Sequence, residues 1–150
     1  MSEKDRAVEL FKEGYNCSQS VFVAFADRFG IDEETAKKIS AGLGGGIGRM
    51  REVCGAVSGA AMVIGSICAP TEGKDNDSKQ KNYELVREFA KRFTEENGSI
   101  ICRELLGLEV KMESSAKPES RTAEYYKKRP CAELVECAAQ ILEELIKEEK

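Results

Sequence analysis

Apolar residues recur three or four positions apart along most of this chain, and no stretch of useful length alternates between apolar and polar residues. This spacing predicts helices, and Asn16 and Asp32 are well placed to cap two of them. The predicted helices span residues 3–12, 17–29, 33–41, 54–70, 78–96, 100–106 and 131 onward. We therefore expect an all-α fold in one domain covering residues 1–150.

The most unusual stretch is residues 42–70, a glycine-rich loop (42–48) followed by a long run without a charged residue. Such a run, in a chain that is 33% charged, predicts a buried helix that starts near Cys54. Small residues recur four apart in it, as in Gly55 and Gly59. Glycine inside a helix costs about 1 kcal/mol relative to alanine. We expect neighbouring backbones to approach these positions closely, so that five to six helices pack around this central Gly/Ala-rich helix.

The same run, residues 53–70, reaches the lower length limit for a helix that spans a membrane. It is dominated by Gly, Ala and Ser, so its hydropathy is low, and no second candidate span exists. We expect no stable membrane insertion. The N-terminal segment is charged and carries no apolar signal core, which favours a cytoplasmic protein.

Charge and composition exclude several classes of function. The net charge is −4 and no basic stripe is present, so nucleic acid is not an expected partner. The chain has no histidine, which excludes Ser-His-Asp and Cys-His catalysis and histidine-ligated zinc or haem. Six cysteines in a reducing compartment are expected to be thiols or metal ligands rather than structural disulfides.

Four cysteines share one local setting, because each falls at the start of a predicted helix, directly after a loop. The free N–H groups and the dipole of a helix N-terminus stabilise a thiolate there. These candidate ligands are Cys17, Cys54, Cys102 and Cys131. The other two, Cys68 and Cys137, are expected a turn or more inside their helices, where a cysteine packs as a small apolar residue.

The spacing of these cysteines leaves their chemistry open. No Cys-x-x-Cys is present, which argues against a thioredoxin-like site and a zinc ribbon. If the four thiols meet, they come from four different elements. That arrangement suits an iron–sulfur cluster, a zinc or other soft-metal ion, or a pair of metal-free redox dithiols.

Cys54 is the expected nucleophile if no metal is bound. It follows the glycine loop and has Arg49 and Arg51 nearby, and cationic neighbours lower a thiol pKa. We expect the helix end and these charges to outweigh burial, so that Cys54 alkylates faster than Cys68 or Cys137.

The chain resembles a family of redox-active proteins named C_GCAxxG_C_C after its cysteine pattern. The resemblance runs through most of the chain, although the family name reads Gly-Cys-Ala where this sequence reads Cys-Gly-Ala. The matching motifs are Tyr15-Asn16-Cys17-Ser18, Gly44-Gly45-Gly46, Cys54-Gly55-Ala56-Val57-Ser58-Gly59, Cys102-Arg103-Glu104-Leu105-Leu106-Gly107, and Cys131.

The resemblance implies that the four helix-start cysteines are the functional ones. The chain also resembles the non-haem part of split-Soret cytochromes, which carries a cluster; without Cys-x-x-Cys-His, no covalent haem is expected.

The first hypothesis is therefore an electron-transfer protein with an iron–sulfur cluster on the four cysteines and an unidentified redox partner protein. The alternatives are a metal-free thiol/disulfide oxidoreductase that uses Cys54 and a resolving cysteine, and a Cys₄ zinc or soft-metal module. The sequence leaves the substrate and the oligomeric state open.

Overall fold

The computed structural model describes residues 1–107 and 130–149. These residues form seven α-helices, two 3-10 helices and one isolated antiparallel bridge between Val53 and Ile101, with no β-strand among them. The all-α prediction is confirmed. The seven α-helices of the described residues slightly exceed the expected five to six.

The helices agree with the predicted spans to within a few residues in most cases. The α-helices are α1 (Glu3–Lys12), α2 (Cys17–Phe25), α3 (Glu33–Ser40), α4 (Gly55–Cys68), α5 (Asn76–Asn97), α6 (Cys102–Leu105) and α8 (Cys131–Glu148), and the 3-10 helices are η1 (Ala26–Phe29) and η2 (Ala41–Leu43). The predicted polar segment at 107–129 lies, beyond Gly107, outside the described residues.

The helix starts follow from local side-chain caps. Asn16 accepts a hydrogen bond from the backbone of Gln19, whose side chain accepts one in return from the Asn16 N–H. Asp32 caps α3 by accepting a hydrogen bond from the Thr35 N–H, so both predicted caps are confirmed. Helix α5 begins two residues earlier than predicted, because Asp75 accepts from the Ser78 N–H.

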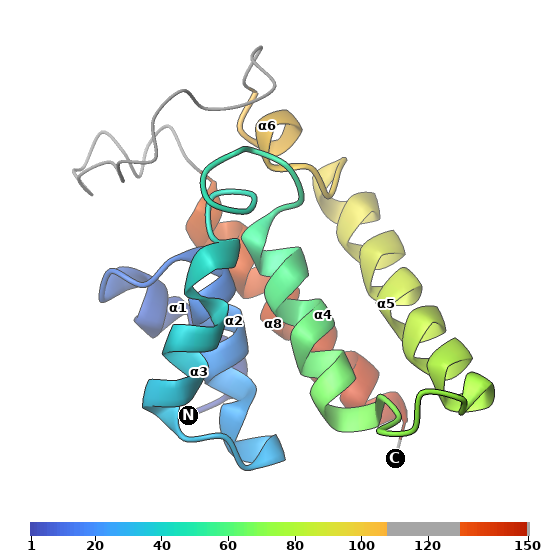
Figure 1. Ribbon diagram of the computed structural model, residues 1–150. Helices are drawn as coiled ribbons and strands as arrows, with labels where there is room; N and C mark the ends of the chain where they lie inside the picture. The colour runs from blue at the N-terminus through green and yellow to red at the C-terminus, as the bar shows by residue number, and fades with distance from the viewer. Residues whose placement is uncertain (108–129, 150) are drawn as a thin grey trace.

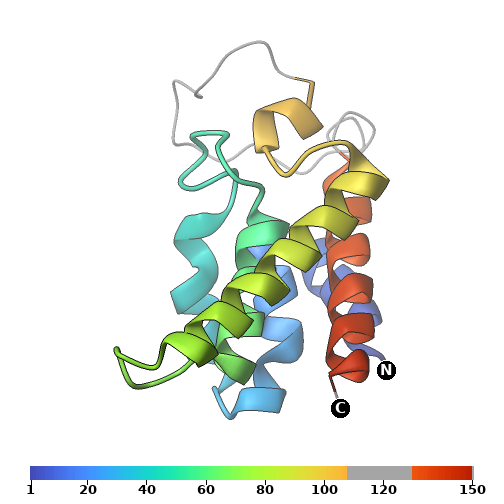
Figure 2. The same ribbon diagram turned by 90° about the vertical axis from the view of Figure 1, so that its right-hand side faces the viewer.

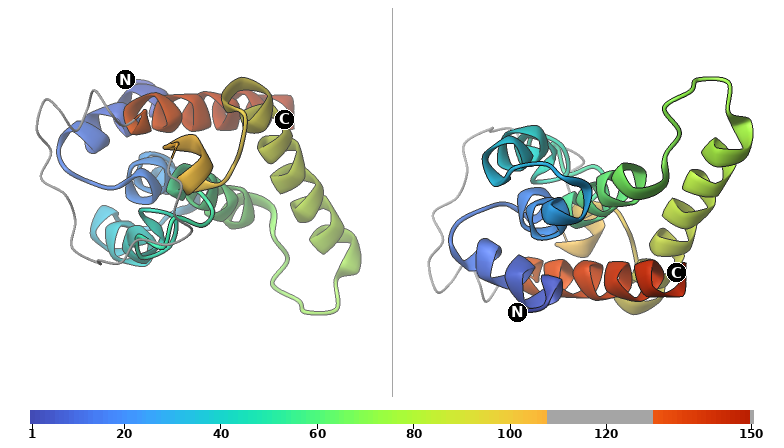
Figure 3. Two further views of the ribbon diagram at one scale, coloured as in Figure 1. Left: turned by 90° about the horizontal axis from the view of Figure 1, so that it is seen from above. Right: turned by 90° about the horizontal axis from the view of Figure 1, so that it is seen from below.

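Helices α1, α2, α4 and α8 pack around a shared apolar core, with α3 against α2 and α5 against α4 and α8 (Figure 1). Helix α5 runs obliquely across the bundle (Figure 2). Seen from above and below, its N-terminal end diverges from the other helices (Figure 3). The expectation of one central helix is not confirmed, since α2 contacts α1, α3, α4 and α8, at least as many helices as α4 contacts.

Helix α4 contacts α2 through glycines. A Cβ atom on Gly59 would lie 2.8 Å from the Ser18 carbonyl oxygen, and one on Gly55 would lie 3.1 Å from the Ser18 nitrogen. The expected close approach of a neighbouring backbone is therefore confirmed at these two positions. At Gly65 the nearest atoms would be 4.0 Å away, so no close contact explains that glycine.

The uncharged run that raised the membrane question contributes only 14 residues to α4. In the described part of the chain, no helix combines the length and the apolar character needed to cross a membrane.

The glycine loop folds over the end of the bundle where α4 and α8 begin (Figure 1). Its backbone has positive φ at Gly45, Gly46 and Gly48, and also at Ile47, Arg49 and Arg51. Internal hydrogen bonds hold this shape, among them those from the Arg51 N–H to the Gly45 carbonyl and from the Glu52 N–H to the Gly46 carbonyl.

The α2–α4 contact yields a stability prediction with a matched control in the same helix. Gly59→Ala should lower the free energy of unfolding by about 1–3 kcal/mol, because the new methyl group collides with the α2 backbone. Gly65→Ala should raise it by about 0.5–1 kcal/mol, since alanine favours the helix and the site is open. Chemical denaturation of both variants checks this, and equal effects would contradict the proposed contact.

Candidate functional site: a four-cysteine pocket

The four helix-start cysteines line one pocket of about 60 Å³ at the end of the bundle covered by the glycine loop. All of them are free thiols. The lining residues are Phe11, Asn16, Cys17, Gly45, Gly46, Arg51, Cys54, Gly55, Cys102, Leu105, Leu106, Cys131 and Leu134. Residues that are far apart in the sequence thus meet at one place.

Two pieces of backbone geometry bring three of these cysteines together. Cys17 begins α2 and Cys54 immediately precedes α4, and a Cβ on Gly55 would lie 3.3 Å from the Cys17 Cβ. The Cys54 N–H donates to the Ile100 carbonyl at 2.8 Å, and the Cys102 N–H donates to the Glu52 carbonyl at 2.6 Å. This short antiparallel pairing joins the segment before α4 to the start of α6.

Cys131, the first residue of α8, completes the group through a hydrogen bond between its side chain and that of Cys17. This hydrogen bond is the largest cause of a raised pKa at Cys17. Burial raises the Cys17 pKa further, as do the charges that Cys131, Cys54 and Cys102 would carry as thiolates. In the metal-free protein, Cys17 is therefore held as a neutral thiol.

The expectation of a low pKa and an accessible sulfur at Cys54 is wrong. Cys54 is only 3% exposed, and burial raises its pKa to about 12. The backbone N–H groups of Ala56 and Val57 at the start of α4 do lower it, as expected for a helix N-terminus, but burial has the larger effect. Cys54 also lies at the cap position before the helix rather than in its first turn.

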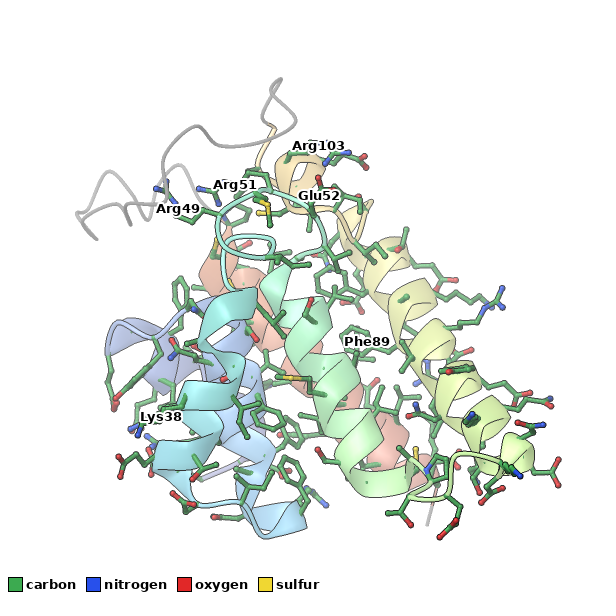
Figure 4. All side chains as sticks on the ribbon, viewed as in Figure 1. Lys38, Arg49, Arg51, Glu52, Phe89 and Arg103 are labelled. Atoms are coloured by element: carbon green, nitrogen blue, oxygen red, sulfur yellow. The ribbon has the colours of Figure 1, made fainter. Side chains whose placement is uncertain are left out.

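The arginine expected near Cys54 contacts a different cysteine. Arg51 Nη1 lies 3.7 Å from the Cys102 sulfur, and the Arg51 side chain is buried, with the residue 6% exposed. In Figure 4, Arg51 and Arg103 lie at the same end of the molecule, at the glycine loop and α6. The basic residues at 127–129, expected to neighbour Cys131, lie outside the described residues.

The remaining two cysteines do not line this pocket. Cys68 is the last residue of α4, several turns past the helix start as expected, and its thiol lies 3.1 Å from the Ile64 carbonyl oxygen. Cys137 is inside α8, where its thiol donates to the Glu96 carboxylate at 2.8 Å. Burial and then Glu96 raise the pKa of Cys137 to about 11, and burial raises that of Cys68.

The pocket contains the thiol ligands of a soft-metal site, but these thiols do not converge on one point as the ligands of a single ion do. Thiolates are the ligands of zinc and of iron–sulfur clusters. Within residues 1–107 and 130–149, however, no group of three or more His, Cys, Asp or Glu side chains converges as a site for a single metal ion.

A family model described as "Putative redox-active protein (C_GCAxxG_C_C)" matches residues 15–145. The chain belongs to this family. The resemblance drawn from the cysteine motifs is thereby confirmed. An uncharacterized protein of Archaeoglobus fulgidus is 27% identical to the chain over 154 residues, which cover 98% of this chain and 95% of the relative. No solved structure gives a significant match.

Sequence reasoning selected the four cysteines but missed how they pair. The pairing of residues 51–54 with residues 100–103 is too short to produce an alternating apolar and polar pattern, so neither segment could be predicted as a strand from its sequence. The one available signal for Arg51 was its position, three residues after the glycine loop and three residues before Cys54.

The raised pKa of Cys54 reverses the expected order of thiol reactivity. In the metal-free reduced protein at pH 8, Cys137 should alkylate at least about tenfold faster than Cys54. Its pKa is about one unit lower, so it has about ten times more thiolate, and it is more exposed. Mass spectrometry of alkylated peptides measures both rates, with the denatured protein as the control. Faster alkylation of Cys54 would contradict this account of its burial.

Proposed function

We propose that this member of the redox-active family is an electron-transfer protein whose four cysteines Cys17, Cys54, Cys102 and Cys131 hold an iron–sulfur cluster. The observation that carries the proposal is the convergence of these four thiols on one pocket. Among the described lining residues, only the cysteines can take a negative charge, so the pocket offers thiolate ligands and no competing carboxylate.

The arrangement of the thiols favours a cluster over a single ion. The four sulfurs of a tetrahedral zinc site must all lie near 2.3 Å from one point. The thiolates of a [4Fe–4S] cluster bind different iron atoms, so they need not converge on one point. The absence, among the described residues, of a converged site for one ion therefore weighs against the Cys₄ zinc module more than against a cluster.

A bound cluster would supply one-electron chemistry, and the chain's own residues would control its surroundings. Phe11, Leu105 and Leu134 give the pocket apolar walls that limit water. The Ala56 and Val57 N–H groups already stabilise the anionic form of the Cys54 sulfur, and metal binding would hold that sulfur as a thiolate. We propose a second redox protein as the partner and the reducing cytoplasm as the location, which suits six free thiols.

The hydrogen bond between Cys17 and Cys131 supports one second candidate, a metal-free thiol/disulfide protein. Oxidation of this pair would form one S–S bond and pass two electrons and two protons to an oxidised partner. Cys54 is not the nucleophile of this candidate, because burial raises its pKa to about 12.

Reconstitution separates these possibilities. The wild-type protein, treated with ferrous iron and sulfide without oxygen, should turn brown and retain both elements. Replacing any one of the four pocket cysteines by Ser should remove most of the bound iron. Cys68→Ala and Cys137→Ala are the matched controls, because both thiols lie outside the pocket. Each should keep the iron and lose at most a few kcal/mol of stability.

Other outcomes assign the pocket differently. A colourless protein that retains zinc on the same four cysteines would support the zinc module. An iron-free protein that forms a Cys17–Cys131 disulfide on mild oxidation, identified by peptide mapping, would support the dithiol candidate. Loss of iron in Cys68→Ala or Cys137→Ala, with the fold intact, would contradict our division of the cysteines.

A further inference from the structure

We propose that Arg51 is a positioning residue that sets the charge balance of the cysteine pocket through the Cys102 sulfur, and so raises the reduction potential of the bound cluster. This inference rests on the cluster proposed above. Arg51 donates from Nη1 to the Cys102 sulfur at 3.7 Å and lines the same pocket as all four cysteines.

The backbone at Arg51 indicates that its side chain is what the position requires. Its φ is 61°, in the left-handed region, which costs a non-glycine residue about 1–2 kcal/mol. A glycine at position 51 would adopt this conformation without that cost, and glycine is common nearby, with five in residues 42–52. An arginine under backbone strain, with its guanidinium on a buried sulfur, points to a functional constraint.

The surrounding backbone fixes the direction of this side chain. The Arg51 N–H donates to the Gly45 carbonyl at 3.1 Å, and its carbonyl accepts from the Arg103 N–H at 3.3 Å and from Arg103 Nη1 at 3.2 Å. Arg103 is itself held by Glu52, 3.2 Å away. A Cβ on Gly46 would lie 2.8 Å from the Arg51 Cα, so only glycine fits beside it. The backbone that carries the Arg51 side chain is therefore held in place, and its guanidinium contacts the Cys102 sulfur.

The charge of this group has a defined effect on the pocket. Arg51 is the one buried charged residue among the described residues, and its guanidinium does not lose its proton. A reduced cluster carries one more negative charge than an oxidised one. A buried cation beside one of the cysteine sulfurs stabilises the reduced form more than the oxidised form, and this raises the reduction potential.

Arg49 provides a matched control. It lies in the same loop, has the same left-handed backbone with φ 63°, and does not line the pocket. Replacing it by Gln changes the charge of the loop and keeps the strained backbone, but leaves the Cys102 contact in place.

The test compares wild type, Arg51→Gln, Arg51→Lys and Arg49→Gln after anaerobic reconstitution with ferrous iron and sulfide. The midpoint potential is measured by mediated titration with dithionite, together with the loss of iron to a chelator. Arg51→Gln should have a lower midpoint potential and lose iron faster than wild type. Arg51→Lys should recover part of the potential, because it keeps the charge without the planar fork. Arg49→Gln should match wild type.

A second measurement has its main readout in the wild type, with Arg51→Lys as the control. In wild type labelled with ¹⁵N-arginine, pulsed EPR of the reduced cluster should detect a nitrogen coupling that Arg51→Lys removes. Equal potentials in wild type and Arg51→Gln, or no arginine coupling in the loaded wild type, would overturn this inference alone. A wild-type protein that takes up no iron would instead overturn the cluster proposal, and this inference with it.

Discussion

The cysteine pocket depends on the close contact between α2 and α4, in which two glycines of α4 face the backbone of α2. A methyl group on Gly59 would lie 2.8 Å from the Ser18 carbonyl oxygen, which leaves no room for it, and one on Gly55 would lie a tight 3.1 Å from the Ser18 nitrogen. Cys17 and Cys54 each come one position before Ser18 and Gly55. The contact that closes the core between these helices therefore also sets how close the two sulfurs come. A larger residue in α4 would move both helices and open the pocket.

The second constraint is the strained loop over the bundle end. Its left-handed residues turn the chain so that residues 51–54 pair with residues 100–103, which brings Cys102 to the pocket beside Arg51. The loop also buries the sulfurs, and burial raises the pKa of Cys17 and Cys54. Cys17 and Cys54 are therefore neutral thiols when the pocket is metal-free, whereas metal coordination would favour their thiolates. This preference agrees better with a ligand role than with an exposed nucleophile at Cys54.

Features that depend on residues close together along the chain could be predicted from the sequence. The helical spacing predicted an all-α fold, and Asn16 and Asp32 were correctly identified as caps because a cap acts over three residues. The family was also recognisable, since its cysteine motifs are read directly from the chain. The predicted boundaries differ from the observed ones by small amounts, as at α5, which Asp75 caps and which begins two residues before the predicted start.

The packing of the helices sets which side chains meet, and whether burial or the helix N-terminus has the larger effect on a thiol pKa. The helix N-terminus does lower the pKa of Cys54, as its position predicted, but the amount of burial depends on the helices and the loop packed around it. Likewise, Arg51 is three residues from Cys54 in sequence, yet its guanidinium lies on Cys102, and Cys17 pairs with Cys131 from a distant part of the chain. Desolvation and Coulomb interactions depend on distances in space, and sequence separation does not set those distances between elements.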